Sequence, residues 1–457
     1  MLSVEEAQDR LLEAVGSPLP VEDVPLAQAL DRALAEPIRS AVDLPPWDNS
    51  SMDGFAVHAA DVAGATATAP IRLRVVGDVR AGGSPHVDVP PGCAVRIATG
   101  APMPPSADAV VPVETTIVAE EGADSAIGEA ARVEPARVEP APAGSTRALG
   151  FRALEPLPDA CLVTAAVEPG AFIRRRGEDV RAGMLLLEPH RRVGPAQIAL
   201  AAAVGVDSLR VHRRPVAGVL STGDELRLAG QELGESGIPD ANRPGLLAMC
   251  SDAGARAADL GIAGDSLESI LRALRPAIEG SDLLIVSGGV SLGPYDIVRT
   301  AFEALGQVEL WRVAIQPGKP FAFGRSSPRD GDGRRVLLFG LPGNPVSALV
   351  TFELFVRPAL QRLSGLPAPT ARVDRAVTEG RLEKAAGRRG YLRVTVVRDG
   401  YGSPIRDPQG RLRVRVAGHQ GSHVLSAMAV ADALAIVPEA VERLEPGAEV
   451  EIRWLRA

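Results

Sequence analysis

The sequence has 457 residues, more than one compact core usually organises, so we expect several domains. Its formal net charge is -8 and its Lys and Arg residues form no long basic run, which argues against a nucleic-acid partner because phosphate backbones bind basic faces. Gly, Pro or charged residues interrupt the apolar runs well before the ~20 residues that a membrane helix requires, and the acidic, polar N-terminus does not resemble a signal peptide.

The chain contains three cysteines, Cys93, Cys161 and Cys250, which lie far apart and lack the spacing of metal ligands. This argues against a disulfide framework and against a zinc site, and a reducing cytoplasm is the simplest expected compartment. Almost all basic residues are Arg, since Lys occurs only at Lys319 and Lys384. A lysine in a sequence that otherwise uses arginine is therefore more informative than usual.

The first 36 residues predict two helices. Ser3 and Glu6 have the spacing of a capping box in front of an amphipathic segment. Leu26, Leu30 and Leu34 follow at four-residue intervals, which predicts a second helix with one apolar face.

From about residue 51 to 165, short alternating runs separated by Gly and Pro turns predict a small β domain. Within it, ARVEP occurs at 131–135 and again at 136–140, and such Ala/Glu/Pro-rich sequence is typical of a surface hairpin or a mobile insert. Residues 166–192 predict an extended segment that returns to the N-terminal region, which would make the β domain an insertion.

From about residue 213 to 362, apolar strands alternate with helical segments, which predicts a parallel sheet covered by helices. Strands are predicted at 216–223, 282–289 and 336–343, and helices at 243–254 and 266–280. The last ~90 residues return to short alternating runs, which favour a small β-barrel or sandwich.

The expected fold is therefore a multidomain α/β protein. Its four expected domains are an N-terminal helical and extended domain (1–50 with 166–192), an inserted β domain (51–165), an α/β domain with a parallel sheet (193–362) and a C-terminal β domain (363–457).

Three predicted strands end in glycine-rich segments, at 221–225, 287–291 and 340–345. Ligands of open parallel sheets bind beyond the carboxyl ends of strands, where glycines allow close backbone approach and helix starts offer N–H groups to phosphate. Each segment alone could be a tight turn without a ligand, but three at equivalent positions predict a phosphate-bearing ligand. The residues expected to line it are Thr222, Gly223, Gly288, Gly289, Ser291, Pro342, Gly343, Asn344 and Pro345.

Carboxylates gather near the same edge, at Asp224, Glu225, Asp240, Asp265 and Asp296. Oxygen ligands of this kind suit Mg²⁺, which usually also binds substrate phosphates. Asp265 and Asp240 could equally be helix caps. In the 316–320 segment (QPGKP), Lys319 could be a solvated loop cation, but we favour contact with phosphate or another oxyanion.

Three earlier segments are unusually polar for a plain scaffold: 46–54 (PWDNSSMDG), 98–102 (ATGAP) and 174–179 (RRRGED). The last could be a surface ion-pair cluster of little energetic consequence. It could also be an anion site, because guanidinium groups form paired hydrogen bonds with oxyanions.

These segments together resemble one family. In the order seen in molybdopterin molybdenumtransferases, a family that includes the E domain of gephyrin, the chain carries DNSSMDGFAV, RIATGAPMP, RRRGEDV, STGDEL, SGGVSLG, PGKPFAFG, LPGNPVSA and GHQGSH. The resemblance covers nearly the whole chain. Each motif alone is weak to moderate, but eight in one order are highly specific.

The resemblance implies a homodimeric enzyme that inserts molybdate into molybdopterin-AMP. Mg²⁺ or another divalent cation would assist cleavage of the pyrophosphate link, with release of AMP and molybdenum cofactor. Each active site would lie between the α/β domain of one subunit and the N-terminal region of the other.

Carried over motif by motif, one group would belong to the face contributed across the dimer: Asp53, Thr99, Arg176 and Asp179. The pocket side would contain Glu225, Asp240, Asp265, Lys319, Pro342, Pro345 and Ser422. We expect catalytic roles for Asp53, Asp179, Glu225 and Lys319, and metal binding by Glu225, Asp265 and Asp296. Some positions depart from the common pattern: Gln316 replaces a second lysine of some relatives, Pro294 replaces a residue that is often acidic, and Trp47 and Phe55 replace other aromatic residues.

Three alternatives remain. A molybdopterin adenylyltransferase shares the α/β domain, but that family favours a GGTG turn where this chain has GGVS, and it lacks the flanking domains. A scaffold protein of the same fold is a second alternative, because one fold can host both roles. A tungstate-using relative is a third, and a complex with the adenylyltransferase is also possible.

Overall fold

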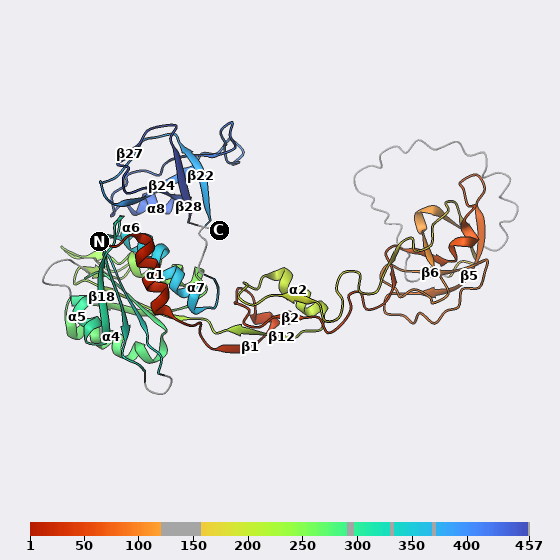
Figure 1. The fold of residues 1–457 in the computed structure, drawn as a ribbon, viewed down its shortest axis with the longest axis horizontal. Helices are drawn as coiled ribbons and strands as arrows, with labels where there is room; N and C mark the ends of the chain where they lie inside the picture. Colours follow the sequence, from red (N-terminus) through yellow and green to blue (C-terminus); the bar gives the residue numbers. More distant parts are fainter. Residues whose placement is uncertain (120–156, 290–296, 330–332, 368–371, 456–457) are drawn as a thin grey trace. The chain divides into compact units, whose positions relative to one another are not determined.

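The computed structural model describes residues 1–119, 157–289, 297–329, 333–367 and 372–455 (Figure 1). These residues form two compact units. Unit 1 comprises Met1–Glu36, Glu188–Ile198 and Ser208–Ala457, and unit 2 comprises Pro37–Leu187 and Ala199–Asp207. Helix α2 (Pro195–Ala203) contains one of the boundaries. The ARVEP repeat lies outside the described residues.

A six-stranded sheet organises unit 1, in the order β16-β13-β17-β21-β20-β18. The first four strands are parallel, as predicted, while β20 runs antiparallel to β21 and β18 runs antiparallel to β20. The strands are β13 (Val216–Thr222), β16 (Arg256–Ala263), β17 (Leu283–Ser287), β18 (Gly306–Arg312), β20 (Pro320–Ser326) and β21 (Leu337–Leu341). The central strands β13, β17 and β21 are buried along their whole length, which explains why their sequences are continuously apolar.

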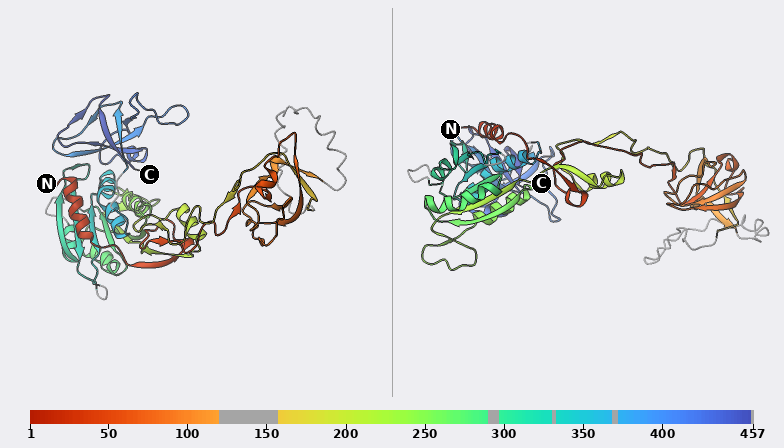
Figure 2. Two further views of the ribbon diagram at one scale, coloured as in Figure 1. Left: turned by 45° about the vertical axis from the view of Figure 1, so that its right-hand side comes forward. Right: turned by 90° about the horizontal axis from the view of Figure 1, so that it is seen from below.

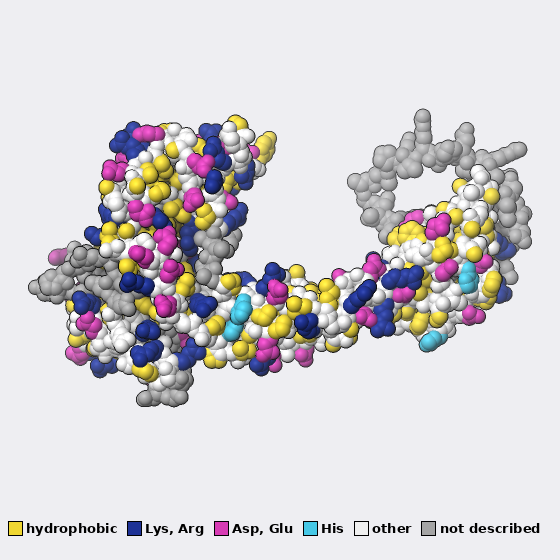
Figure 3. Space-filling view, viewed as in Figure 1, with side chains coloured by type: hydrophobic (Ala, Val, Ile, Leu, Met, Phe, Trp, Pro, Cys, Tyr) yellow, Lys and Arg dark blue, Asp and Glu magenta, His cyan; other side chains and the backbone are white. Residues whose placement is uncertain are grey.

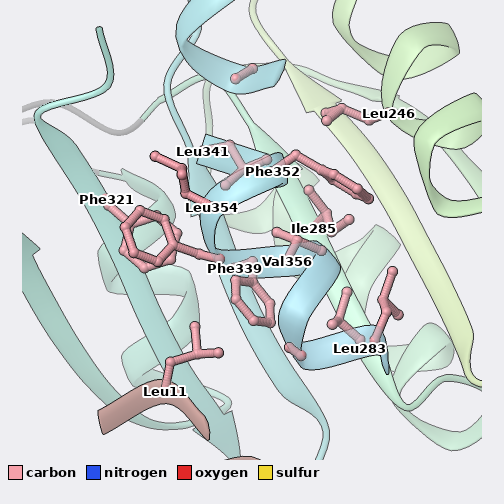
Figure 4. Packing of buried hydrophobic residues seen from close by; sticks show 14 of the residues in the cluster. Leu11, Leu246, Leu283, Ile285, Phe321, Phe339, Leu341, Phe352, Leu354 and Val356 are labelled. Carbon is pink, nitrogen blue, oxygen red and sulfur yellow. The ribbon is translucent and has the colours of Figure 1, made fainter. Parts of the chain in front are cut away.

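Helices cover both faces of this sheet (Figure 2). Alternate strand residues point to opposite faces, so Leu283 and Ile285 join one hydrophobic cluster, while Leu284 and Val286 join the other. Figure 4 shows the first cluster, in which Phe339 packs among strand and helix residues. The helices of the first face are α1 (Val4–Val15), α3 (Asn242–Asp252), α6 (Pro345–Thr351) and α7 (Arg357–Leu363), with a π-helical turn (Phe352–Val356) joining the last two; α4 (Leu267–Gly280) and α5 (Ile297–Glu303) cover the second.

The first helix begins at the predicted capping box. Ser3 Oγ accepts a hydrogen bond from Glu6 N at 3.0 Å, and Glu6 Oε2 accepts one from Ser3 N at 2.8 Å. Val4, Ala7 and Leu11 form the buried face of α1, which packs against α7 within the first hydrophobic cluster.

The second predicted N-terminal helix is wrong. Residues Val21–Pro25 form strand β1, which pairs antiparallel with β12 (Ser208–His212), and only a short 3₁₀ turn (Leu26–Gln28) follows. Asp31 has a φ of 61°, which a helix does not permit. Leu30 is therefore exposed while Leu34 is buried beside Val211, so the leucines share no helical face. Pairing with a distant strand has overridden the local four-residue pattern.

The C-terminal part of unit 1 is a closed five-stranded barrel, so the predicted β structure is confirmed. The circuit β24-β25-β22-β28-β26 closes because β26 also pairs with β24, which leaves no open edge in the circuit. The strands are β22 (Val373–Thr378), β24 (Arg389–Val396), β25 (Leu412–Val416), β26 (Ala433–Val437) and β28 (Glu449–Trp454). Shorter elements of unit 1 are β14 (Leu226–Arg227), β15 (Ile238–Pro239), β19 (Ile315–Gln316), β23 (Leu382–Glu383), α8 (Leu425–Ala429) and β27 (Arg443–Leu444).

Unit 2 contains the predicted β domain, a six-stranded sheet in the order β7-β4-β6-β5-β9-β8. The strands are β4 (Gly54–Val57), β5 (Ile71–Val79), β6 (Cys93–Ile97), β7 (Ala109–Pro112), β8 (Thr116–Ala119) and β9 (Ala160–Val163); 3₁₀ turns lie at Ala59–Val62 and Val113–Thr115. The return segment is extended, as predicted: β10 (Ile173–Arg174) pairs with β3 (Asn49–Ser50), and β11 (Leu185–Leu187) pairs with β2 (Ile38–Arg39). The β domain therefore lies between two chain segments that pair with each other.

Candidate active site

Three strand ends lie side by side in unit 1. The register pairs Ser221 of β13 with Ser287 of β17, and Ser287 with Leu341 of β21, so the three glycine-rich segments meet at one edge of the sheet. Gly288 has a φ of 103°, and a Cβ there would lie 2.4 Å from the carbonyl oxygen of Thr222. The segments thus approach each other as closely as glycine allows, which confirms that they are neighbours.

Acidic side chains surround the end of β13. Asp265 Oδ1 accepts a hydrogen bond from Thr222 Oγ1 at 2.8 Å, and Asp265 Oδ2 accepts one from Asp224 N at 3.3 Å. In return, Asp224 Oδ1 accepts a hydrogen bond from Asp265 N at 3.1 Å. The Glu225 carboxylate folds back over Gly223, where a Cβ would lie 2.7 Å from Glu225 Oε1. Asp265 therefore stands beside β13, although it does not cap α4, whose N-cap is Ser266.

Asp240 has a different setting, because its side chain is buried. Its Oδ1 accepts hydrogen bonds from Ser221 Oγ at 3.0 Å and Arg243 N at 3.2 Å, and its Oδ2 accepts one from Arg243 Nε at 2.9 Å. Arg243 also pairs with Asp259, and these two carboxylates raise the pKa of Arg243 against the opposing effect of burial. Asp240 thus joins β13 to the start of α3 from within the protein.

Two further predicted segments contact α6, one at its start and the other at its end. Ser422 O accepts a hydrogen bond from Val346 N at 3.1 Å, so the GHQGSH segment (418–423) contacts the segment after β21. Gly318 lies against the same helix, since a Cβ there would be 2.6 Å from Thr351 Cγ2. Lys319 is half-buried, and among the described residues no carboxylate forms an ion pair with it.

The remaining predicted residues lie in unit 2. Asp53 Oδ1 accepts hydrogen bonds from Thr99 N at 2.6 Å and Thr99 Oγ1 at 2.8 Å. Arg176 lies in an ion-pair cluster, because its Nε donates to Asp43 Oδ2 at 2.6 Å. Asp179 is exposed and donates its backbone N–H to Leu44 O at 3.1 Å.

Hydrogen bonds hold the loop around Arg176 in place. Asp48 Oδ1 accepts a hydrogen bond from Arg176 N, and Asp48 Oδ2 accepts one from Arg175. The backbone bond from Arg176 is the largest effect that lowers the pKa of Asp48, and the backbone bond from Ala182 is the largest that lowers the pKa of Asp43. Both carboxylates therefore stay ionised at neutral pH, and they reduce the net positive charge of the arginine run.

Comparison with known proteins identifies the family. The N-terminal region of MoeA proteins (domains I and II) matches residues 2–205, a probable molybdopterin binding domain matches 218–362, and the MoeA C-terminal region (domain IV) matches 375–455. A molybdopterin molybdenumtransferase from Haemophilus influenzae is 32% identical, over 99% of this chain and 98% of its own length. The chain belongs to the molybdopterin molybdenumtransferase family. A second relative, molybdopterin molybdenumtransferase 2 from Mycobacterium tuberculosis, is 35% identical over 99% of each chain.

Solved structures agree with this assignment. A molybdopterin biosynthesis MoeA protein from Pyrococcus horikoshii superposes with a TM-score of 0.72 and 29% identity, with 100% of both chains covered. The expected fold and the expected enzyme class, a transferase, are thereby confirmed.

Arg393, a buried residue of β24, also belongs to this region, although no sequence motif points to it. Its NH2 group donates to His419 O at 2.9 Å and Gly421 O at 3.0 Å, while its Nε and NH1 have no partner among the described residues. Burial lowers the pKa of Arg393. Gln420 accepts a hydrogen bond from Arg393 N at 2.8 Å, so this arginine supports the GHQGSH segment from below. The only signal in the sequence is an arginine between Leu392 and Val394 in a strand.

Two predicted residues, Ser291 and Asp296, lie outside the described residues. Within the part of the chain that the structure describes, no three His, Cys, Asp or Glu side chains gather as a metal site would require, and no helix is long and apolar enough to cross a membrane. A cavity of about 640 Å³ lies elsewhere in unit 1, between α1 and the barrel, and its lining includes Arg389 and Tyr391 but none of the predicted site residues.

Charged side chains of both signs are interspersed over the face shown in Figure 3. With the net charge of -8, this distribution gives no support to a nucleic-acid partner.

Proposed function

We propose that this protein inserts molybdate into molybdopterin-AMP, with release of AMP and molybdenum cofactor. The observation that supports this most is the meeting of three glycine-rich strand ends at one sheet edge, with the GHQGSH segment against the start of α6. Lys319 follows Gly318, which contacts α6. Backbone N–H groups and cationic side chains there suit the phosphates of a nucleotide and a tetrahedral oxyanion. The relatives are named molybdopterin molybdenumtransferases, which supports the pterin part of the substrate.

The residues present fit a Mg²⁺ ion that is shared with the substrate. Mg²⁺ usually takes one or two carboxylates and completes its shell with water and phosphate oxygens. Asp265 accepts one described hydrogen bond at each oxygen, and each oxygen has a second lone pair. Asp265 and Glu225 would hold the ion, with the predicted third ligand Asp296 outside the described residues. When bound, the ion would neutralise charge on the phosphates as the phosphoanhydride bond breaks.

Residues of unit 1 would bind and orient the substrate. Lys319 would bind an anionic oxygen of molybdate or of a substrate phosphate. Asp240 would act indirectly, because its buried carboxylate fixes Ser221 and the start of α3. Hydrolysis of the phosphoanhydride by water would yield AMP and leave the terminal phosphate on the pterin. The two dithiolene sulfurs would replace oxo groups of molybdate, which would take up the thiol and solvent protons and leave as water.

We further propose that the unit 2 group, Asp53, Thr99, Arg176 and Asp179, completes the site of a second copy in a homodimer. This proposal rests on the family resemblance, and the two groups of predicted residues lie in different units. The buried, free cysteines are compatible with the cytoplasm, since burial raises the pKa values of Cys161 and Cys250 to about 12 and keeps both thiols protonated. Association with a molybdopterin adenylyltransferase is an additional possibility.

The test is molybdate-dependent AMP release from molybdopterin-AMP in the presence of Mg²⁺. We expect Asp53→Asn and Glu225→Gln each to abolish release. Unfolding and refolding the two variants together should restore about a quarter of the wild-type rate, because half of the dimers would be mixed and each mixed dimer would contain one intact site. Tight nucleotide binding without release would favour a scaffold instead, and failure of the mixture to recover would contradict a site shared between copies.

A further inference from the structure

Asn242 is placed between two of the glycine-rich segments. It is the first residue of α3, directly after the chain leaves β15. Its Nδ2 donates to Ser287 Oγ at 2.8 Å and to Gly343 O at 2.7 Å. One side chain therefore joins the segment after β17 to the segment after β21, which are far apart in the sequence.

The direction of these hydrogen bonds is fixed. Gly343 O can only accept, so the amide nitrogen of Asn242, and not its oxygen, must face it. Ser287 Oγ then accepts from Asn242 and points its own hydrogen toward Pro342 O, 3.4 Å away. Both hydrogen bonds of Asn242 Nδ2 are therefore made to these two segments. The buried Oδ1 of Asn242 accepts no hydrogen bond from a described residue.

Hydrogen bonds of the buried Asp240 fix the position of Asn242. Asp240, two residues earlier, is buried and binds both Ser221 Oγ at the end of β13 and Arg243 N in the first turn of α3. The start of α3 is thus attached to one strand end, while Asn242 binds the other two. Gly343 passes close to Gly288, since a Cβ on Gly343 would lie 3.6 Å from Gly288 Cα.

We propose that Asn242 is a positioning residue for the proposed reaction, one that sets the separation between the segments at 287–289 and 342–345 so that both can bind one phosphate-bearing substrate. The inference rests on the proposed function for its substrate class only. The geometric part, the binding of both segments by one amide, stands on the contacts of Asn242. Without the amide, Gly343 O loses its donor, and the 3.4 Å contact of Ser287 Oγ with Pro342 O is the side-chain hydrogen bond that remains between the two described segments, so their separation is less firmly set.

The test compares Asn242→Asp and Asn242→Ala with Ser251→Ala, a control on the same helix that removes one hydrogen bond to Leu247 O. Aspartate keeps the shape of asparagine but places a carboxylate oxygen against Gly343 O. We expect AMP release by either Asn242 variant to fall at least tenfold in kcat/KM, with the control within twofold of wild type. The Gly343 carbonyl oxygen disfavours a facing carboxylate and raises its pKa, and a protonated aspartic acid can again donate to Gly343 O. The activity of Asn242→Asp relative to wild type at the same pH should therefore rise as the pH falls.

Hydrogen exchange of the same proteins without substrate separates the two proposals. Faster exchange at 287–289 and 342–348 in both Asn242 variants, with Ser251→Ala unchanged, would support the positioning role even if wild type released no AMP, an outcome that would sink the proposed function alone. Unchanged exchange in these segments, or Asn242 variants with full kcat/KM, would overturn the positioning role. A variant that fails to fold would be replaced by Asn242→Ser, for which the same outcomes apply.

Discussion

The contact between Thr99 and Asp53 makes one residue-scale prediction. Asp53 Oδ1 accepts both bonds from Thr99, so the hydroxyl of Thr99 supplies half of what orients the carboxylate. Replacing Thr99 by Val removes the side-chain bond and keeps the shape. Because a hydrogen bond to a charged group contributes about 1.5–3 kcal/mol when buried and less at this exposed site, we expect about a tenfold loss of AMP release.

Thr99→Ser is the matched control for that prediction, since it keeps the hydroxyl and loses only a methyl group. Initial rates of AMP release for the two variants and wild type, at saturating and low substrate, provide the measurement. Equal rates for Thr99→Val and Thr99→Ser would show that the side-chain bond to Asp53 has no part in the reaction.

At the residue scale, the sequence predicts which residues belong to the candidate site, but not which of them contact each other. Asp53 and Thr99 each occur in a recognisable motif, but their hydrogen bond depends on the pairing of Gly54 with Ile97 between β4 and β6, which the sequence does not reveal. Arg393 was not predicted because alternation along YLRVTV points it outward, whereas it is fully buried. The GHQGSH segment covers the outer face of that strand, and such long-range packing leaves no local pattern.

At the scale of secondary-structure elements, the close approach of β17 to β13 at Gly288 constrains the site. An alanine there would have to adopt a φ near +103° and place its Cβ 2.4 Å from the Thr222 carbonyl oxygen. Gly254, after α3, has a φ of +87° but nothing within 4 Å of a Cβ. Gly254→Ala should therefore cost only the ~1–2 kcal/mol of a left-handed alanine, whereas Gly288→Ala should also displace the end of β17 and abolish AMP release.

The measurement for this glycine pair is unfolding by urea together with AMP release. The Gly254→Ala protein should release AMP at close to the wild-type rate despite its lower stability. If both variants lost activity in proportion to their stability, the close approach of Gly288 to β13 would have no specific importance.

Elements with strong local signals were predicted correctly, while those set by distant pairing were not. Strand β17 is five apolar or small residues bounded by Asp282 and Gly288, and α1 begins at its capping box. The leucines after β1 also recur at a helical spacing. However, β1 pairs with β12, which lies almost 200 residues later in the chain, and this pairing leaves no local pattern in the sequence. The antiparallel pairing of β18 with β20 and of β20 with β21 was likewise not predicted, because the alternation of strands and helices indicated a parallel sheet.

At the scale of the whole molecule, the insertion of the β domain was anticipated from the change in periodicity and from the extended return segment. The structure shows why the return segment is extended: β10 and β11 pair with β3 and β2, the strands that lead into the domain. The predicted boundaries of the four domains stay predictions. Contacts divide the chain into two units, with α1 packed into the core of the unit 1 sheet.

Separate hydrophobic cores predict that the two units unfold in two calorimetric transitions. Ile97 in unit 2 and Ile285 in unit 1 are both fully buried strand residues, so they form a matched pair. Each Ile→Val change should cost about 0.5–1.5 kcal/mol, which corresponds to a shift of about 1–6 °C in unit 2 and a smaller shift in the larger unit 1. Ile97→Val should lower one transition and Ile285→Val the other, because neither side chain belongs to the core of the opposite unit. A single transition that both changes lower equally would mean that the units unfold as one cooperative body, and the contact-based division would then have no thermodynamic counterpart.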